Sequence, residues 1–171
     1  MKSILFTILI FTGITTVNGQ YKNAVGVKVN HYKLAANLKH FISDVNALDL
    51  EVGFQKDGVE FIGLYNWQVP VSNVSGLYWY YGFGLNLGCW SDDWSRRVSF
   101  GIDGQIGLEY VPSEIPIVFS IDYTPNYSIQ DIYTKSIDTH DKTSGFWREN
   151  WTIGIKVKIS SKSSSEAEEV N

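Results

Sequence analysis

Apolar and polar residues alternate along most of this chain from Val25 onward, and Trp151–Ile159 shows the pattern most clearly. In that segment every second residue is Trp, Ile or Val, and Thr, Gly and Lys lie between them. Successive side chains of a β-strand point to opposite sides, so this alternation predicts a strand with one apolar and one polar face.

Eight segments carry the same alternation. Leu34–Ile42 is the weakest, with Lys39 assigned to its polar face, and Ile62 and Leu64 break the alternation in the fourth segment. Many segments have about the 9–11 residues with which a tilted strand crosses a bilayer. Pro125 cannot donate a ladder hydrogen bond, so we expect a bulge or an early strand end there. The predicted strands are Val25–Asn30, Leu34–Ile42, Leu48–Phe54, Glu60–Val69, Leu77–Gly88, Arg97–Tyr110, Ile117–Ile129 and Trp151–Ile159.

The connections between these strands alternate in length. The turns at one end are short, whereas the other end has a longer loop at Cys89–Arg96 and the longest at Gln130–Asn150, beside two short ones. Such an arrangement is typical of outer-membrane barrels. We therefore predict an all-β fold, a single eight-stranded antiparallel transmembrane up-and-down β-barrel. The short connections are Ser43–Asn46, Pro70–Gly76 and Val111–Ile115 at the first end, and His31–Lys33 and Gln55–Gly58 at the second.

The sizes of the side chains predict which face points inward. The polar face carries mostly Gly, Ser, Asn, Asp and Glu, and the apolar face carries Trp, Phe, Tyr, Ile and Leu. The interior of an eight-stranded barrel is just wide enough for side chains to fill, so the large apolar set would overpack it. On the outside that set would aggregate in water but is stable against lipid. We therefore expect the polar face to line the interior.

The predicted inner face carries nearly balanced charge. Because a buried charge needs a partner, this balance favours an internal salt-bridge network over an ion-selective pore lined by one sign. The predicted lumen network consists of the basic residues Lys28, Lys39, Arg97, Lys156 and Lys158 and the acidic residues Asp49, Glu51, Glu60, Asp103, Glu109 and Asp122.

Aromatic residues of the apolar face gather toward both ends of the predicted strands. Amphipathic rings favour the headgroup region of a bilayer, so we interpret them as an aromatic girdle, with ordinary core aromatics as the alternative. The predicted girdle consists of Trp67, Trp79 and Tyr110 at the short-turn end and Phe54, Phe61, Tyr127 and Trp151 at the long-loop end.

The N-terminus has the pattern of a secretory signal peptide. Lys2 precedes an apolar run from Ile4 to Ile14, and Val17-x-Gly19 fits a cleavage site. The run is shorter than the roughly 20 apolar residues that a membrane-spanning helix needs. We expect residues 1–19 to be a signal peptide, 20–159 to form the barrel and 160–171 to be a disordered polar tail, with the mature protein in a bacterial outer membrane.

Composition narrows the function classes. A length of 171 residues suits one domain, and 44% apolar residues exclude a disordered chain. The single cysteine, Cys89, excludes an intrachain disulfide framework and a Cys-rich zinc module. A net charge of −4 gives no electrostatic footprint for nucleic acid.

Several motifs resemble those of a known family. The sequence G-x-D-G-x-I-G-L-E-Y begins at Gly101, I-P and S-x-D-x-x-P follow at Ile115 and Ser120, and K-H-F and Y-Y-G-x-G begin upstream at Lys39 and Tyr80. Over residues 23–159 the chain resembles small eight-stranded outer-membrane barrels of Gram-negative bacteria, similar in architecture to OmpX and the OmpA membrane domain. The resemblance implies that fold and location, and it implies no known ligand.

The last predicted strand resembles the signal that the outer-membrane insertion machinery reads. Thr152, Gly154, Val157 and Ile159 match its polar-x-Gly-x-x-apolar-x-apolar form. The segment departs from the pattern because it ends in Ile159 instead of Phe or Trp and because a tail follows it. The resemblance implies two partners, outer-membrane lipid and that insertion machinery.

No pattern identifies a catalytic, metal or cofactor site. The chain has no G-x-S-x-G elbow, and the nearness of Ser128 and Ser136 to His140 in the sequence does not define a nucleophile–base pair. The other histidines are His31 and His40.

The acidic residues beside His140 could suggest a metal site. Asp138 and Asp141 flank it, but in a polar loop we interpret this group as solvated charge. We therefore expect neither cofactor nor enzyme activity.

The expected function is that of an outer-membrane barrel with a lumen plugged by side chains. It would present surface loops, chiefly residues 130–150, for structural, adhesion or recognition roles. One alternative is a secreted soluble barrel of lipocalin type, with the aromatic face inward around a small apolar ligand. Another is a lipid-modifying outer-membrane enzyme.

Overall fold

The computed structural model describes residues 21–91, 93, 95–134, 139–147 and 150–160. The predicted signal peptide and the tail beyond Ser160 lie outside these residues. No helix long and apolar enough to cross a membrane occurs in the described part of the chain. Its ten strands are β1 (Asn23–Val29), β2 (Leu34–Phe41), β3 (Asn46–Gln55), β4 (Gly58–Pro70), β5 (Leu77–Ser91), β6 (Ser95–Tyr110), β7 (Ile117–Tyr123), β8 (Asn126–Thr134), β9 (Thr139–Trp147) and β10 (Trp151–Ser160).

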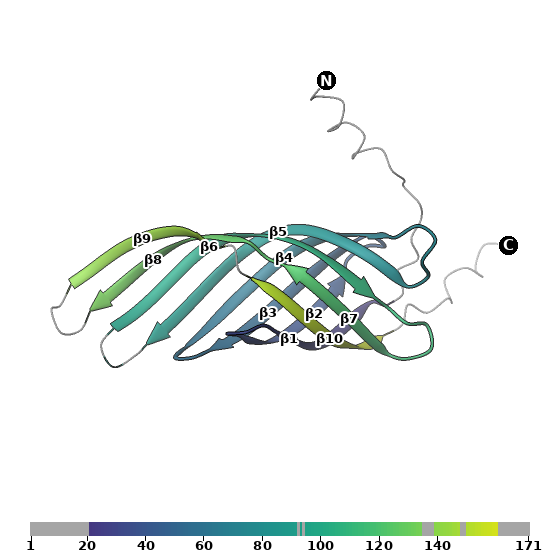
Figure 1. Cartoon of the computed structure of the whole chain (residues 1–171), viewed down its shortest axis with the longest axis horizontal. Coiled ribbons are helices and arrows are strands. Elements are labelled where there is room, and N and C mark those ends of the chain that lie inside the picture. The colour runs from purple at the N-terminus through teal and green to yellow at the C-terminus, as the bar shows by residue number, and fades with distance from the viewer. Residues whose placement is uncertain (1–20, 92, 94, 135–138, 148–149, 161–171) are drawn as a thin grey trace, which may run out of the picture.

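The strands form a closed antiparallel barrel (Figure 1). Strands β1 to β7 pair in chain order, β7 then pairs with β10, and β10 pairs with β1 to close the ring. β8 continues the position of β7, since β6 pairs with β7 over Ile106–Tyr110 and with β8 over Ser95–Asp103. The prediction of an eight-stranded antiparallel barrel is therefore confirmed.

The break between β7 and β8 falls at the predicted proline. β7 ends at Tyr123, β8 begins at Asn126, and Pro125 lies between them. The Pro125 carbonyl still accepts a hydrogen bond from the Gly104 N–H at 2.9 Å, although the proline nitrogen cannot donate one. The expected early strand end is confirmed.

The predicted long loop at Gln130–Asn150 is wrong, because β8 and β9 form a paired hairpin over most of it. Likewise β5 and β6 extend into the predicted loop Cys89–Arg96 and leave only residues 92–94 between them. These strands make the barrel much taller on one side, so the β8–β9 hairpin projects beyond β1 and β10 (Figure 1). Among the described residues, β9 pairs only with β8.

The sequence pattern did not predict the second strand of this hairpin, β9, for a physical reason. Alternation arises where a sheet separates an apolar from a polar environment. Lys142, Thr143 and Ser144 of β9 are all exposed, and no apolar face distinguishes this strand. The pairing with β8, which is rich in Tyr and Ile, holds the segment in a strand.

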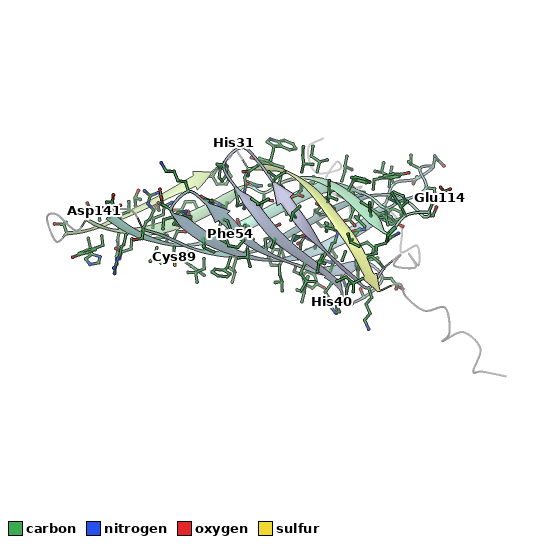
Figure 2. All side chains as sticks on the ribbon, turned by 90° about the horizontal axis from the view of Figure 1, so that it is seen from below. His31, His40, Phe54, Cys89, Glu114 and Asp141 are labelled. Carbon is green, nitrogen blue, oxygen red and sulfur yellow. The ribbon has the colours of Figure 1, made fainter. Side chains whose placement is uncertain are left out.

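Burial confirms which face points inward. Along β6, Ser99 and Asp103 are buried, whereas the intervening Phe100 and Ile102 are 55% and 60% exposed. The two residues that break the alternation in β4, Ile62 and Leu64, lie inside the barrel. Side chains stand out all along the outer wall, as in Figure 2.

An apolar cluster closes the short-turn end of the barrel. Tyr21, just before β1, packs edge-on against Phe41 with ring centroids 5.0 Å apart. Ala24, Ala47, Tyr78, Val111 and Val118 complete this buried cluster. The interior between this cluster and the opposite mouth is filled mainly by polar side chains.

Candidate functional site

A group of three carboxylates surrounds one lysine in the middle of the interior, here called the upper cluster. Lys28 Nζ of β1 donates to Glu51 of β3 and lies 3.4 Å from Asp49 Oδ2 and 3.5 Å from Asp122 Oδ1. All four side chains are almost fully buried. Inward positions of β1, β3 and β7 meet here because the interior is only wide enough for side chains.

A second group, here called the lower cluster, lies nearer the apolar cluster. Glu109 Oε2 receives hydrogen bonds from Lys39 Nζ at 2.9 Å and from Lys156 Nζ at 3.0 Å. Its other oxygen, Oε1, accepts from the Tyr21 hydroxyl at 2.7 Å and from Gln68 at 3.1 Å. One carboxylate thus has four donors, which compensates the cost of removing it from water.

Tyr80 joins the two clusters. Its hydroxyl donates to Asp122 Oδ2 of the upper cluster at 2.9 Å, and Lys39 Nζ of the lower cluster lies 4.5 Å from its ring centroid. A Cβ at Gly107 would lie 2.5 Å from Tyr80 Cζ, so a glycine at this position leaves room for the ring. Asp122 Oδ1 also accepts from Thr152 at 2.8 Å and Gln105 at 3.0 Å.

The structure brings seven of the predicted network residues together in these two clusters. Three lysines face four carboxylates, which leaves a formal charge of −1. The seven are Lys28, Lys39, Asp49, Glu51, Glu109, Asp122 and Lys156.

Glu60 forms a separate pair that the sequence analysis missed. Its Oε2 lies 3.1 Å from Nζ of Lys33, which sits just before β2. Burial alone would lower the pKa of Lys33, but the charges of Glu60 and Glu51 outweigh it and raise that pKa. Lys33 and Lys39 are an even number of positions apart, so in one strand their side chains point to the same face. This spacing is the signal that could have placed Lys33 inside.

The remaining three predicted network residues lie outside both clusters and outside the Lys33–Glu60 pair. Asp103 is buried and accepts from Asn86 Nδ2 at 2.7 Å, without a cationic partner among the described residues. Lys158 is half-buried and donates to the Pro112 carbonyl at 2.9 Å. Arg97 lies at the opposite mouth and is exposed. Lys158 and Arg97 are near strand ends, where the wall no longer excludes water.

The seven predicted girdle residues all lie on the outer face. At the short-turn end, the Trp67 and Trp79 rings stack on Tyr81 with centroids 5.5 Å and 5.1 Å apart. At the other end, Trp151 packs against Tyr123 at 4.9 Å. Tyr110, Phe54, Phe61 and Tyr127 are exposed.

The interior opens into a cavity of about 450 Å³ at the end opposite the apolar cluster. Most of the residues that line it are polar, and they include Glu60, Asn86, Ser128 and Asn150. Trp90 is its largest ring. A cavity of this size is in the range of small-molecule sites.

The candidate catalytic and metal residues do not assemble into a site in the described part of the chain. His140 Nδ1 lies 2.9 Å from Asp131 Oδ1 on the exposed hairpin, whereas Ser128 faces the interior. Ser136 and Asp138 lie outside the described residues. Among those described, no group of three His, Cys, Asp or Glu side chains could hold a metal ion.

Comparison of the chain with protein-family models, curated proteins and solved structures finds no match.

Proposed function

We propose that this protein is an outer-membrane β-barrel of a Gram-negative bacterium, not an enzyme, with a closed interior. In this proposal it holds the β8–β9 hairpin and the cavity at the outer surface. The observation that carries the proposal is the apolar outer face, which continues around the closed barrel.

Every strand of the closed barrel contributes to this apolar face. Phe83 and Ile102 are 62% and 60% exposed, more than a water-soluble barrel tolerates over a continuous surface. Lipid would cover such a face without cost, and a closed barrel leaves no unpaired edge within a bilayer. One exposed residue from each strand illustrates the belt: Val27, Leu34, Leu50, Phe61, Phe83, Ile102, Ile121 and Ile155.

Two features of the sequence support this location. The N-terminal apolar run after Lys2 suits export across the inner membrane. Thr152 and Gly154 point into the barrel, while Val157 and Ile159 are exposed on the outer face. The last strand therefore presents these two apolar side chains to the outer-membrane insertion machinery.

The packed interior favours a structural, adhesion or recognition role over transport. Buried ion pairs and the apolar cluster fill the barrel below the cavity. The hairpin projects from the mouth and carries exposed polar residues, including Asp141, which Figure 2 places far from Glu114 at the short-turn end. In this proposal the hairpin replaces the predicted loop as the presented surface.

Cell fractionation of the full chain, with boiled and unboiled samples compared on a denaturing gel, tests the proposal. We expect the protein in the outer-membrane fraction and a heat-dependent change in mobility, because a closed barrel resists detergent until it is boiled. The matched control is the same chain without residues 2–19, which should remain in the cytoplasm.

A soluble protein without a mobility shift would contradict the proposal. A soluble lipocalin-like barrel would need its aromatic face inward, and the exposed Phe54, Phe83 and Trp151 argue against that arrangement. Loss of a lipid-directed activity on replacing Ser128 or His140, with the barrel still folded, would favour an enzyme instead.

A further inference from the structure

The cavity at the open mouth is built from inward positions of neighbouring strands. Trp90 of β5 pairs directly with Gly58 of β4 on one side and with Arg97 of β6 on the other. Ser99 and Gln130 are paired in the row below. These residues therefore form one continuous patch of wall, which the extension of β5, β6 and β8 beyond the short strands creates.

Trp90 is held as a flat platform in this wall. A Cβ on Gly58 or on Gly88 would overlap its indole ring, so the two glycines leave the space in which the ring lies against the backbone. The Trp90 Nε1–H donates to Gln55 Oε1 at 3.3 Å and fixes the ring orientation. An aromatic ring positioned in this way can pack against the C–H face of a sugar ring.

Two positively charged side chains line the cavity and have no partner in the described part of the chain. Lys56 and Arg97 form no ion pair or side-chain hydrogen bond with any described residue. Among the described residues that line the cavity, only Glu60 carries a carboxylate, and it is already paired with Lys33 at 3.1 Å. The cavity therefore favours an anionic ligand, and the planar guanidinium of Arg97 matches a carboxylate best.

Neutral polar side chains complete the wall. Ser99, Ser128 and Gln130 line the cavity, and their side chains form no hydrogen bond with any other described residue. Two hydroxyls and an amide thus face the cavity as both donors and acceptors. This combination suits a ligand with several hydroxyl groups, because such a ligand also donates and accepts.

We propose that this cavity binds an acidic saccharide, a sugar ring that carries a carboxylate. The ring stacks on Trp90, the carboxylate binds Arg97 with support from Lys56, and the hydroxyls bind Ser99, Ser128 and Gln130. The inference rests on the geometry of the barrel mouth and does not depend on where in the cell the barrel resides.

Calorimetric titration of the full mature chain in detergent micelles tests this inference at low salt. The probe is a tetrasaccharide of alternating glucuronate and N-acetylglucosamine, and the reference is the neutral tetramer of N-acetylglucosamine. We expect saturable binding of the acidic probe, about tenfold or more tighter than the neutral one. Raising the salt concentration should weaken the binding.

Variants locate the binding in the cavity. Arg97→Gln removes one of the two unpaired positive charges of the cavity wall and should weaken binding of the acidic probe about fivefold or more. The matched control is Arg96→Gln, because this neighbouring residue lies on the outer face of the same strand and should leave binding within about twofold of wild type. Trp90→Ala should abolish most of the stacking and weaken binding of both saccharides.

The heat-dependent gel shift verifies that each variant is folded. If Trp90→Ala does not fold, the comparison of Arg97→Gln with Arg96→Gln still tests the inference. Three results would overturn the inference: no saturable binding of the acidic probe, equal binding of the neutral one, or equal losses from Arg96→Gln and Arg97→Gln. A chain that binds the acidic probe but is soluble would refute the proposed location and leave this inference intact.

Discussion

At the residue scale, the interior depends on side chains that each satisfy several partners. Glu109 accepts from Lys39, Lys156, Tyr21 and Gln68, and Tyr80 contacts both charged clusters. Buried charges of this kind contribute little net stability when paired, but they are costly when one partner is removed.

We predict that Glu109→Gln lowers the free energy of unfolding by about 3–5 kcal/mol, because Lys39 and Lys156 lose their shared carboxylate inside the barrel. Urea unfolding in detergent or lipid, followed by Trp fluorescence, measures the change. Adding Lys156→Met to Glu109→Gln should restore part of the loss, since it removes one unpaired cation.

The control for this prediction is Lys158→Met. Lys158 is half-buried and, among the residues that the structure describes, binds only the Pro112 carbonyl, so its replacement should cost about 1 kcal/mol. If Glu109→Gln were as stable as wild type, the lower cluster would not depend on its carboxylate.

A charge added to the apolar outer face should destabilise the barrel. Ile121 of β7 is 46% exposed in the apolar belt, and Ile121→Arg should destabilise the lipid-inserted barrel by about 2–4 kcal/mol if the position is near the bilayer midplane. Unfolding titrations in lipid vesicles measure it. Ser144→Arg, an exposed position on β9 beyond the barrel, should leave stability unchanged. Equal stability of both variants would mean that lipid does not cover the belt.

Among the strands, β8 and β9 are the two that we expect can be shortened while the closed ring remains. In the described part of the chain, β9 pairs only with β8, and β8 pairs on its other side with the first half of β6. The closed ring below uses β7 and β10 in their place. The projecting hairpin is therefore an addition to the barrel, not a part of its closure.

Replacing residues 131–142 by Asn-Gly should leave the barrel folded, because Gln130 and Thr143 are paired and a two-residue turn can join them. The heat-dependent gel shift and the urea midpoint should match wild type. A corresponding deletion in β5, of Gly84–Leu87, is the contrast and should abolish the shift, since it removes rows of the closed ring. Loss of the shift in the hairpin variant would show that β8 and β9 are needed for folding.

At the scale of the whole molecule, the barrel is closed at one end and hollow at the other. The apolar cluster, the lower cluster and the upper cluster fill the interior, and the cavity lies above them. The tall wall formed by β5, β6 and β8 surrounds part of that cavity.

We predict that the protein reconstituted in a planar bilayer shows no stable single-channel conductance, because the buried side chains of the apolar cluster and of the two charged clusters occupy the interior between the cavity and the short-turn end. The measurement is current at fixed voltage in about 1 M salt. A porin in the same bilayer serves as the positive control. Regular conductance steps from the wild-type chain would contradict a plugged interior.

The order of residues alone predicts a strand correctly wherever that strand separates the interior from an apolar surface. The alternation in Trp151–Ile159 and the break at Pro125 are both found in the structure. Lys28, Lys39 and Asp122 occupy alternate positions on the predicted polar face, and this also placed them inside. These features are local consequences of side-chain direction, so they can be read along the chain.

Which inward residues meet depends on the three-dimensional fold. The pairing of Lys33 with Glu60, the link through Tyr80 and the approach of Trp90 to Gly58 depend on strand register around the whole ring. The β8–β9 hairpin was missed because β9 has no apolar face, so its strand character depends on its partner. Register and ring closure are properties of all strands together, and no single segment encodes them.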